Sequence, residues 1–126
     1  MNQQPGPVIV DIAGTSLTPE DRERLAHPRV GGVILFARNF ESAGQVARLT
    51  ADMRTARDGA LLVCVDHEGG RVQRFRDGFS AIEPMRALGQ RWDVDPVDAC
   101  RQATAIGATI GRELKAVGVD LSFTPV

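Results

Sequence analysis

The chain has 126 residues, 43% of them hydrophobic and 25% charged, with a formal net charge of −1, as expected of one ordinary globular domain. The balance of charge and the lack of a basic run argue against nucleic acid or an anionic membrane as a partner. The polar N-terminus and the lack of an apolar stretch of roughly 18 residues argue against a signal peptide and a membrane span, so we expect a cytoplasmic protein.

A strand and a short helix are predicted at the start of the chain. Residues 8–13 are rich in β-branched side chains and stop at Gly14, which is typical of a strand. Thr18 and Pro19 have the residue types preferred at the N-cap and the first position of a helix. This helix is expected to end near Pro28.

A second strand and helix are predicted next. The apolar residues 32–36 indicate the strand. Ser42 and Gln45 have the spacing of a capping box, so we expect a helix to begin there. Apolar side chains then recur at helical spacing until Asp58 and Gly59, which predict the end of the helix.

The second half of the chain predicts two more strands around a long connection. Residues 61–65 are an unbroken apolar run, which is typical of a strand buried on both faces of a parallel sheet. The connection, residues 66–94, is expected to contain one short helix around 85–91. A long helix is predicted over 95–117, and residues 119–124 predict the fourth strand.

The order of these elements indicates an α/β fold. Strands that alternate with helices are joined by right-handed crossovers, which produce a parallel sheet with helices packed on it. No linker or change of composition divides the chain, so residues 1–126 are interpreted as a single domain. A four-stranded sheet with helices on one face is an incomplete architecture. Its two unpaired edges should make the isolated chain associate or aggregate.

The residues after the third strand are the strongest candidates for a site. Parallel α/β folds bind ligands at the carboxyl ends of their strands, which is the position of Asp66. Because side chains alternate along a strand, Asp66 should share the concave face with Leu62 and Cys64. Its carboxylate can accept hydrogen bonds from sugar hydroxyls or hold a cation. Alternatively, it pairs with Arg71 or Arg74 and only stabilises the loop.

The residues beside Asp66 allow two further hypotheses. His67 and Glu68 suggest a metal-dependent hydrolase, but adjacent side chains point in different directions and the chain has only two histidines. We therefore expect no metal and no cofactor. Gly69 and Gly70 are weak evidence for phosphate binding and fit a plain turn better.

Several other polar residues are secondary candidates. Asp11 and the neighbouring Arg38 and Asn39 also follow strands, so they are expected to line the pocket or support it. The two cysteines, Cys64 and Cys100, are too few for a disulfide framework and lack metal-ligand spacing. Both are expected to be buried free thiols.

Residues 66–74 (DHEGGRVQR) form a long motif, with residues 31–39 (GGVILFARN) before it and residues 118–126 (GVDLSFTPV) after it. Together these segments resemble bacterial β-N-acetylhexosaminidases of glycoside hydrolase family 3. The resemblance implies the N-terminal half of a (β/α)8 TIM barrel, with about four strand–helix units of which the last is incomplete. It also implies that Asp66 binds hydroxyls of the terminal sugar and that Arg74 lies in the same subsite.

This family is known for a two-step retaining hydrolysis that removes terminal N-acetylglucosamine from muropeptides in the cytoplasm during cell-wall recycling. In the family, an arginine after the fourth strand and a Lys-His pair after the fifth also contact the sugar. The histidine proton donor and the aspartate nucleophile come later still. The chain is thus expected to hold part of the sugar site, no catalytic residue, and no activity alone. The alternative is a standalone α/β module that binds a small polar ligand through residues 66–74 and covers both borders of its sheet.

Overall fold

The computed structural model describes residues 4–57 and 60–126, and its main element is a parallel sheet. The strands follow each other in chain order: β1 (Val8–Val10), β2 (Val30–Leu35), β3 (Leu62–Val65) and β6 (Leu121–Ser122). Every neighbouring pair is parallel, as expected for strands joined by crossover helices. The predicted α/β sheet is confirmed, although the first and last strands are shorter than the expected 8–13 and 119–124.

The helices also agree with the sequence pattern. Their bounds are α1 (Pro19–Ala26), α2 (Ala43–Ala56), α3 (Arg86–Val94) and α4 (Pro96–Ala116). Thr18 and Ser42 cap α1 and α2 through complete capping boxes, which satisfy amide groups that would otherwise lack partners. The predicted end of α2 at Asp58 and Gly59 lies outside the described residues.

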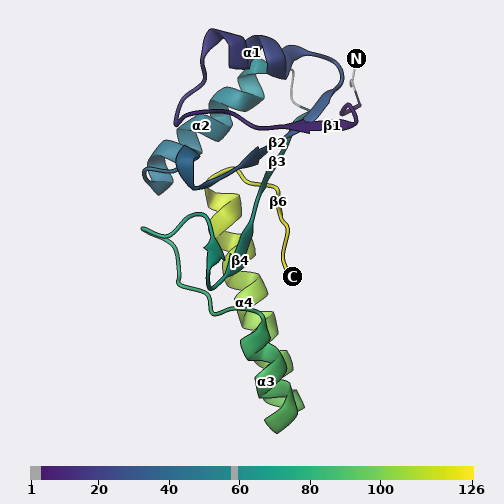
Figure 1. Ribbon diagram of the computed structural model, residues 1–126, viewed down its shortest axis with the longest axis vertical. Helices are drawn as coiled ribbons and strands as arrows, with labels where there is room; N and C mark the ends of the chain where they lie inside the picture. The colour runs from purple at the N-terminus through teal and green to yellow at the C-terminus, as the bar shows by residue number, and fades with distance from the viewer. Residues whose placement is uncertain (1–3, 58–59) are drawn as a thin grey trace.

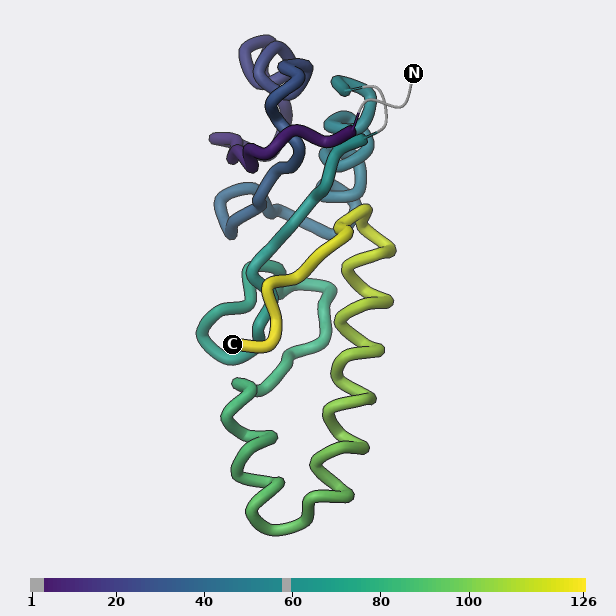
Figure 2. Tube along the Cα trace, turned by 90° about the vertical axis from the view of Figure 1, so that its right-hand side faces the viewer, coloured from purple at the N-terminus to yellow at the C-terminus, as the bar shows by residue number. Residues whose placement is uncertain are grey.

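The core lies on the face of the sheet that the helices cover, and Figures 1 and 2 show α2 and α4 along this face. Because side chains alternate along a strand, every second residue of β2 and β3 points towards the helices. These strand residues and the helix residues against them are almost fully buried: Val33, Leu35, Val63, Val65, Val46, Leu49, Met53 and Leu114.

The opposite face of the sheet carries apolar side chains that remain accessible. Ile9 is 46% exposed, Leu62 38% and Leu121 41%. Gly32 lies between the first two, since a Cβ atom there would lie 3.2 Å from Ile9 Cγ1 and 3.4 Å from Leu62 Cβ. Among the described residues, no strand pairs with the outer edge of β1 or β6. The sheet therefore lacks the covered borders that a standalone module would have.

The connection after β3 contains more structure than the sequence predicted. It begins with an antiparallel hairpin of β4 (His67–Gly69) and β5 (Val72–Gln73), which was expected to be a loop. The short helix predicted around 85–91 is confirmed as α3. Figures 1 and 2 show that α3 and α4 run side by side and extend well beyond the sheet.

Candidate functional site

Asp66 directly follows Val65, the last residue of β3, and so stands at the carboxyl end of a parallel strand. The residues before it are β-branched or apolar and are stable as a strand, because this conformation buries Val63 and Val65 fully against the helices. The Asp66 side chain is 24% exposed, so its carboxylate remains accessible to a ligand. The structure places this residue where the strand pattern predicted.

Gly69 and Gly70 reverse the chain so that β5 returns beside β4. Their φ angles are 89° and 59°, a region that glycine adopts without steric cost. A Cβ atom at Gly69 would lie 2.4 Å from the Glu83 carbonyl oxygen, and one at Gly70 would lie 2.8 Å from Pro84 Cγ. Both glycines are therefore needed for a tight turn packed against another segment, which supports the plain turn rather than a phosphate loop.

The hairpin brings Arg74 back to Asp66. The Arg74 amide donates to the Asp66 carbonyl oxygen over 3.3 Å, and Arg74 Nη2 lies 3.6 Å from Asp66 Oδ2. With side chains 31% and 24% exposed, such a pair contributes only about 0–1 kcal/mol to folding. Loop stabilisation is thus a minor effect. An ionised carboxylate has about four acceptor positions, so one long contact leaves capacity for ligand hydroxyls.

A second Asp–Arg pair lies at the same edge of the sheet. Arg38 pairs with Asp11, and its Nε donates to the Ile12 carbonyl oxygen over 3.2 Å. The guanidinium carbons of Arg38 and Arg74 lie 4.7 and 5.7 Å from the centroid of the Phe36 ring. Phe36 was not among the predicted site residues, although its position directly after β2 was a usable signal.

Asn39 is a supporting residue rather than a pocket residue. It ends the short 3-10 helix η1 (Ala37–Asn39) and is fully buried. Its side-chain amide donates to the carbonyl oxygens of Ile12 and Gly14 over 3.1 and 2.8 Å, and its Oδ1 accepts from the Phe36 amide over 2.9 Å. These bonds join the ends of β1 and β2 and so fix the edge on which the two Asp–Arg pairs lie.

A hollow of about 360 Å³ adjoins Arg74 on the side of the hairpin. Three arginines, Arg71, Arg74 and Arg76, line it together with one acidic residue, Asp77. Arg76 is anchored, because its Nη2 donates to the Gly70 carbonyl oxygen over 2.8 Å. The arrangement favours an anionic group beside the Asp66–Arg74 pair, since guanidinium groups bind carboxylates with directional hydrogen bonds.

His67 points into the protein and not towards Asp66. It is fully buried, with ring centroids 6.1 Å from Phe75 and 5.7 Å from Phe79. Burial lowers the pKa of His67, Arg76 lowers it further, and Glu113 opposes this effect. Within the described part of the chain, no three His, Cys, Asp or Glu side chains gather in a way that would hold a metal ion. Asp66, His67 and Glu68 therefore do not converge on one metal site in this part of the chain.

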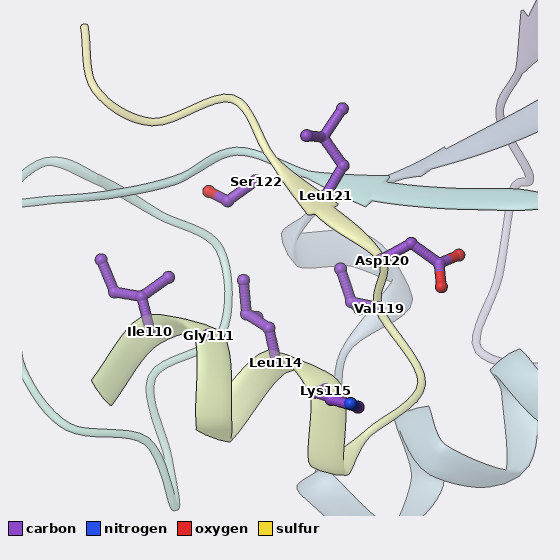
Figure 3. A pocket seen from close by; sticks show the side chains of 8 residues that line it. All are labelled: Ile110, Gly111, Leu114, Lys115, Val119, Asp120, Leu121 and Ser122. Atoms are coloured by element: carbon purple, nitrogen blue, oxygen red, sulfur yellow. The ribbon is translucent and has the colours of Figure 1, made fainter. Parts of the chain in front are cut away.

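Another hollow, of about 350 Å³, lies between α4 and β6 (Figure 3). Ile110 and Leu114 from α4 line it together with Val119, and Figure 3 shows Leu121 pointing away from the helix. Its acidic residue, Asp120, is already bound, because it accepts from Arg54 Nη2 and from the Val63 amide, both over 2.8 Å. This hollow follows the open border of the sheet and does not include the Asp66–Arg74 pair.

The two cysteines differ in accessibility. Cys64 is a buried free thiol as predicted, and burial raises its pKa. Cys100 is a free thiol but is exposed, so the prediction that it is buried was wrong. The reason is its place on α4, where Ala99 faces the neighbouring helix and the next residue turns to solvent. In the part of the chain that the structure describes, no helix combines the length and apolarity needed to cross a bilayer.

Comparison with known proteins identifies relatives of this chain. A β-hexosaminidase of Bordetella avium is 59% identical over 123 residues, which are 97% of this chain and 35% of the relative. NagZ of Neisseria gonorrhoeae in complex with zinc ion superposes with a TM-score of 0.94 and 48% identity, over 97% of this chain and 37% of that chain. NagZ of the same organism in complex with N-trifluoroacetyl-D-glucosamine superposes with a TM-score of 0.93 and 48% identity, over 97% of this chain and 36% of that chain.

These matches extend over nearly all of the fold described above, including the strand end that carries Asp66. The chain spans about a third of the length of the curated relatives it matches. The model of the glycosyl hydrolase family 3 N-terminal domain matches residues 8–126. The resemblance seen in the sequence is therefore confirmed, and the half-covered parallel sheet is the N-terminal part of this family's TIM barrel. The chain belongs to the glycosyl hydrolase family 3 N-terminal domain family.

Proposed function

We propose that this chain forms part of the sugar-binding site of a retaining β-N-acetylglucosaminidase, in which Asp66 and Arg74 bind the terminal N-acetylglucosamine. The observation that carries the proposal is the Asp66–Arg74 pair at the carboxyl end of β3. Barrel enzymes place their substrate sites at this end of the strands. The structural relative with a bound N-trifluoroacetyl-D-glucosamine supports the choice of sugar.

The substrate we propose is a muropeptide fragment, with release of N-acetylglucosamine during peptidoglycan recycling in the cytoplasm. The support is the hollow beside the pair, where Arg71 and Arg76 outnumber Asp77 even when Arg74 is counted with Asp66. A muropeptide carries carboxylates beyond its terminal sugar, and guanidinium groups are well suited to bind them.

Residues 1–126 are proposed to act as one partial domain without catalytic residues, cofactor or metal. A retaining glycosidase needs a nucleophile and an acid/base group close to the scissile bond. We propose that both come from outside these residues and that the 126-residue chain alone does not hydrolyse glycosides. Its accessible apolar face, with Ile9, Leu62 and Leu121, and the outer edges of β1 and β6 should make it associate when it is alone.

The proposal is tested by a chimera in which residues 1–126 replace the matching segment of the Bordetella avium β-hexosaminidase. We expect this chimera to hydrolyse an aryl N-acetyl-β-glucosaminide. Asp66→Asn should reduce kcat/KM at least about 100-fold, because sugar hydroxyls lose a charged acceptor in the transition state as well as in the ground state. Asp93→Asn, at an exposed aspartate of α3, is the matched control and should leave the rate unchanged. An active Asp66→Asn chimera would contradict the proposal.

A further inference from the structure

The two peptide groups on either side of His67 are held by hydroxyl groups of the neighbouring strand: Ser122 accepts from the Asp66–His67 peptide, and Thr124 donates to the His67–Glu68 peptide. Thr124 Oγ1 lies 2.8 Å from the His67 carbonyl oxygen, and the His67 amide lies 3.3 Å from Ser122 Oγ. The two hydroxyl oxygens are 2.7 Å apart. One direction of donation satisfies these three contacts: the His67 amide donates to Ser122, Ser122 donates to Thr124, and Thr124 donates to the His67 carbonyl oxygen, from which Ser122 Oγ itself lies 3.4 Å away. Each hydroxyl then donates once and accepts once.

This arrangement replaces a missing main-chain bond. The Phe123 amide donates to the Val65 carbonyl oxygen over 3.1 Å, so β6 continues the ladder past its last strand residue. In a parallel ladder the next bond would join the amide two residues on, at position 125, to the His67 carbonyl oxygen. Position 125 is a proline, which has no amide hydrogen to donate. The Thr124 hydroxyl makes the bond instead.

Resting on the proposed function, we infer that Ser122 and Thr124 are positioning residues for Asp66. They touch no sugar in this proposal. Ser122 holds the Asp66–His67 peptide directly, and Thr124 holds the next peptide and the Ser122 hydroxyl, so that together they fix the backbone from which the Asp66 side chain projects. On its other side, the Asp66 backbone is restrained by the Arg74 amide, which donates to the Asp66 carbonyl oxygen over a long 3.3 Å, and His67 pairs with Gln73 in the hairpin. Without the hydroxyls, the carboxylate would sample several directions at the strand end, and binding would have to order it.

The test uses the chimera described above, in which residues 1–126 replace the matching segment of the Bordetella avium β-hexosaminidase, and its Thr124→Val variant, which keeps the shape of the side chain and removes the hydroxyl. Two quantities are measured: hydrogen exchange of the His67 amide, and the Kd for N-acetylglucosamine from an NMR titration. Thr124→Val should speed exchange and weaken binding about three- to tenfold, as expected for one lost hydrogen bond. Thr124→Ser should restore both values, because it restores the donor. Ser122→Ala, which removes the intermediate hydroxyl, should have a similar effect to Thr124→Val.

The matched control is Thr104→Val, which removes a hydroxyl that donates to the Cys100 carbonyl oxygen on exposed α4. It should change neither quantity. A purely structural role for Thr124 predicts a lower melting temperature with an unchanged Kd for the folded fraction, and this result would overturn the inference. Unchanged exchange in Thr124→Val would also overturn it. If the unmodified chimera does not bind N-acetylglucosamine, the proposed function itself fails, and this is seen before any variant is compared.

Discussion

Replacing His67 with leucine should make the protein more stable and remove part of its dependence on pH. The imidazole is fully buried beside Phe75 and Phe79, and neither ring nitrogen has a hydrogen-bond partner among the described residues. A buried polar group without a partner costs about 1–3 kcal/mol. Leucine has a similar size and no polar atom, so we expect His67→Leu to gain about 1 kcal/mol in free energy of unfolding at pH 8.

The sign of the pH effect follows from the direction of the pKa shift. Burial lowers the pKa of His67 in the folded protein, so the unfolded chain binds the proton more readily. Above the unfolded pKa of about 6.5, His67 is neutral in both states and its protonation costs the folded protein no stability. As the pH falls below this value towards the folded pKa, the unfolded chain takes up the proton first, and the free energy of unfolding decreases. The slope in this window is at most about 1.4 kcal/mol per pH unit, the value for one proton.

Urea unfolding followed by circular dichroism between pH 8 and pH 5 measures this effect. The difference between the unmodified protein and His67→Leu should widen as the pH falls, because carboxylates titrate equally in both proteins. His27→Gln is the matched control, since His27 is the other histidine of the chain and is exposed. It should lack the gain in stability of His67→Leu, because replacing an exposed histidine relieves no buried group that lacks a partner. A constant difference between the unmodified protein and His67→Leu over this range would refute the reasoning.

Three further outcomes are expected. Gly118→Ala should lower the free energy of unfolding by at least about 2 kcal/mol in urea, because φ is 80° there and a Cβ atom would lie 2.3 Å from Thr50 Oγ1. Gly107→Ala should raise it by up to about 1 kcal/mol, because no atom lies within 4 Å of the added Cβ and alanine favours the helix; a loss of stability there would contradict the open environment. A thiol reagent should modify Cys100 rapidly and Cys64 only upon unfolding, since burial raises the pKa of Cys64; equal rates measured by mass spectrometry would argue against this.

The helices and strands were predictable where local chemistry decides them. Thr18 and Ser42 cap helices through bonds to residues three positions later, so their effect can be read from neighbouring positions. The hairpin of β4 and β5 was not predictable in this way. Its strands have three and two residues, too few for a pattern, and its turn depends on Glu83 and Pro84 packing against the glycines. Such contacts between distant segments leave no periodic signal.

The same distinction applies to the candidate site. Asp66 was predictable from its place after an apolar run, because strand ends in parallel sheets meet at one edge. The contact of Arg74 with Asp66 was one of two pairs that the sequence left open, and only the hairpin decides between them. The burial of His67 and the exposure of Cys100 were not predictable from residue type. Each depends on which way a single side chain turns, His67 towards Phe75 and Phe79 and Cys100 towards solvent.

The extension of α3 and α4 beyond the sheet determines what intrinsic fluorescence can report. The single tryptophan, Trp92, lies on α3 near the far end of this helical pair and is 54% exposed. Its emission will respond to separation of the two helices and hardly at all to events around Asp66. Unfolding curves recorded by emission and by ellipticity should therefore differ if this helical pair opens before the sheet. A second fluorophore beside β3 would be needed to observe ligand binding optically.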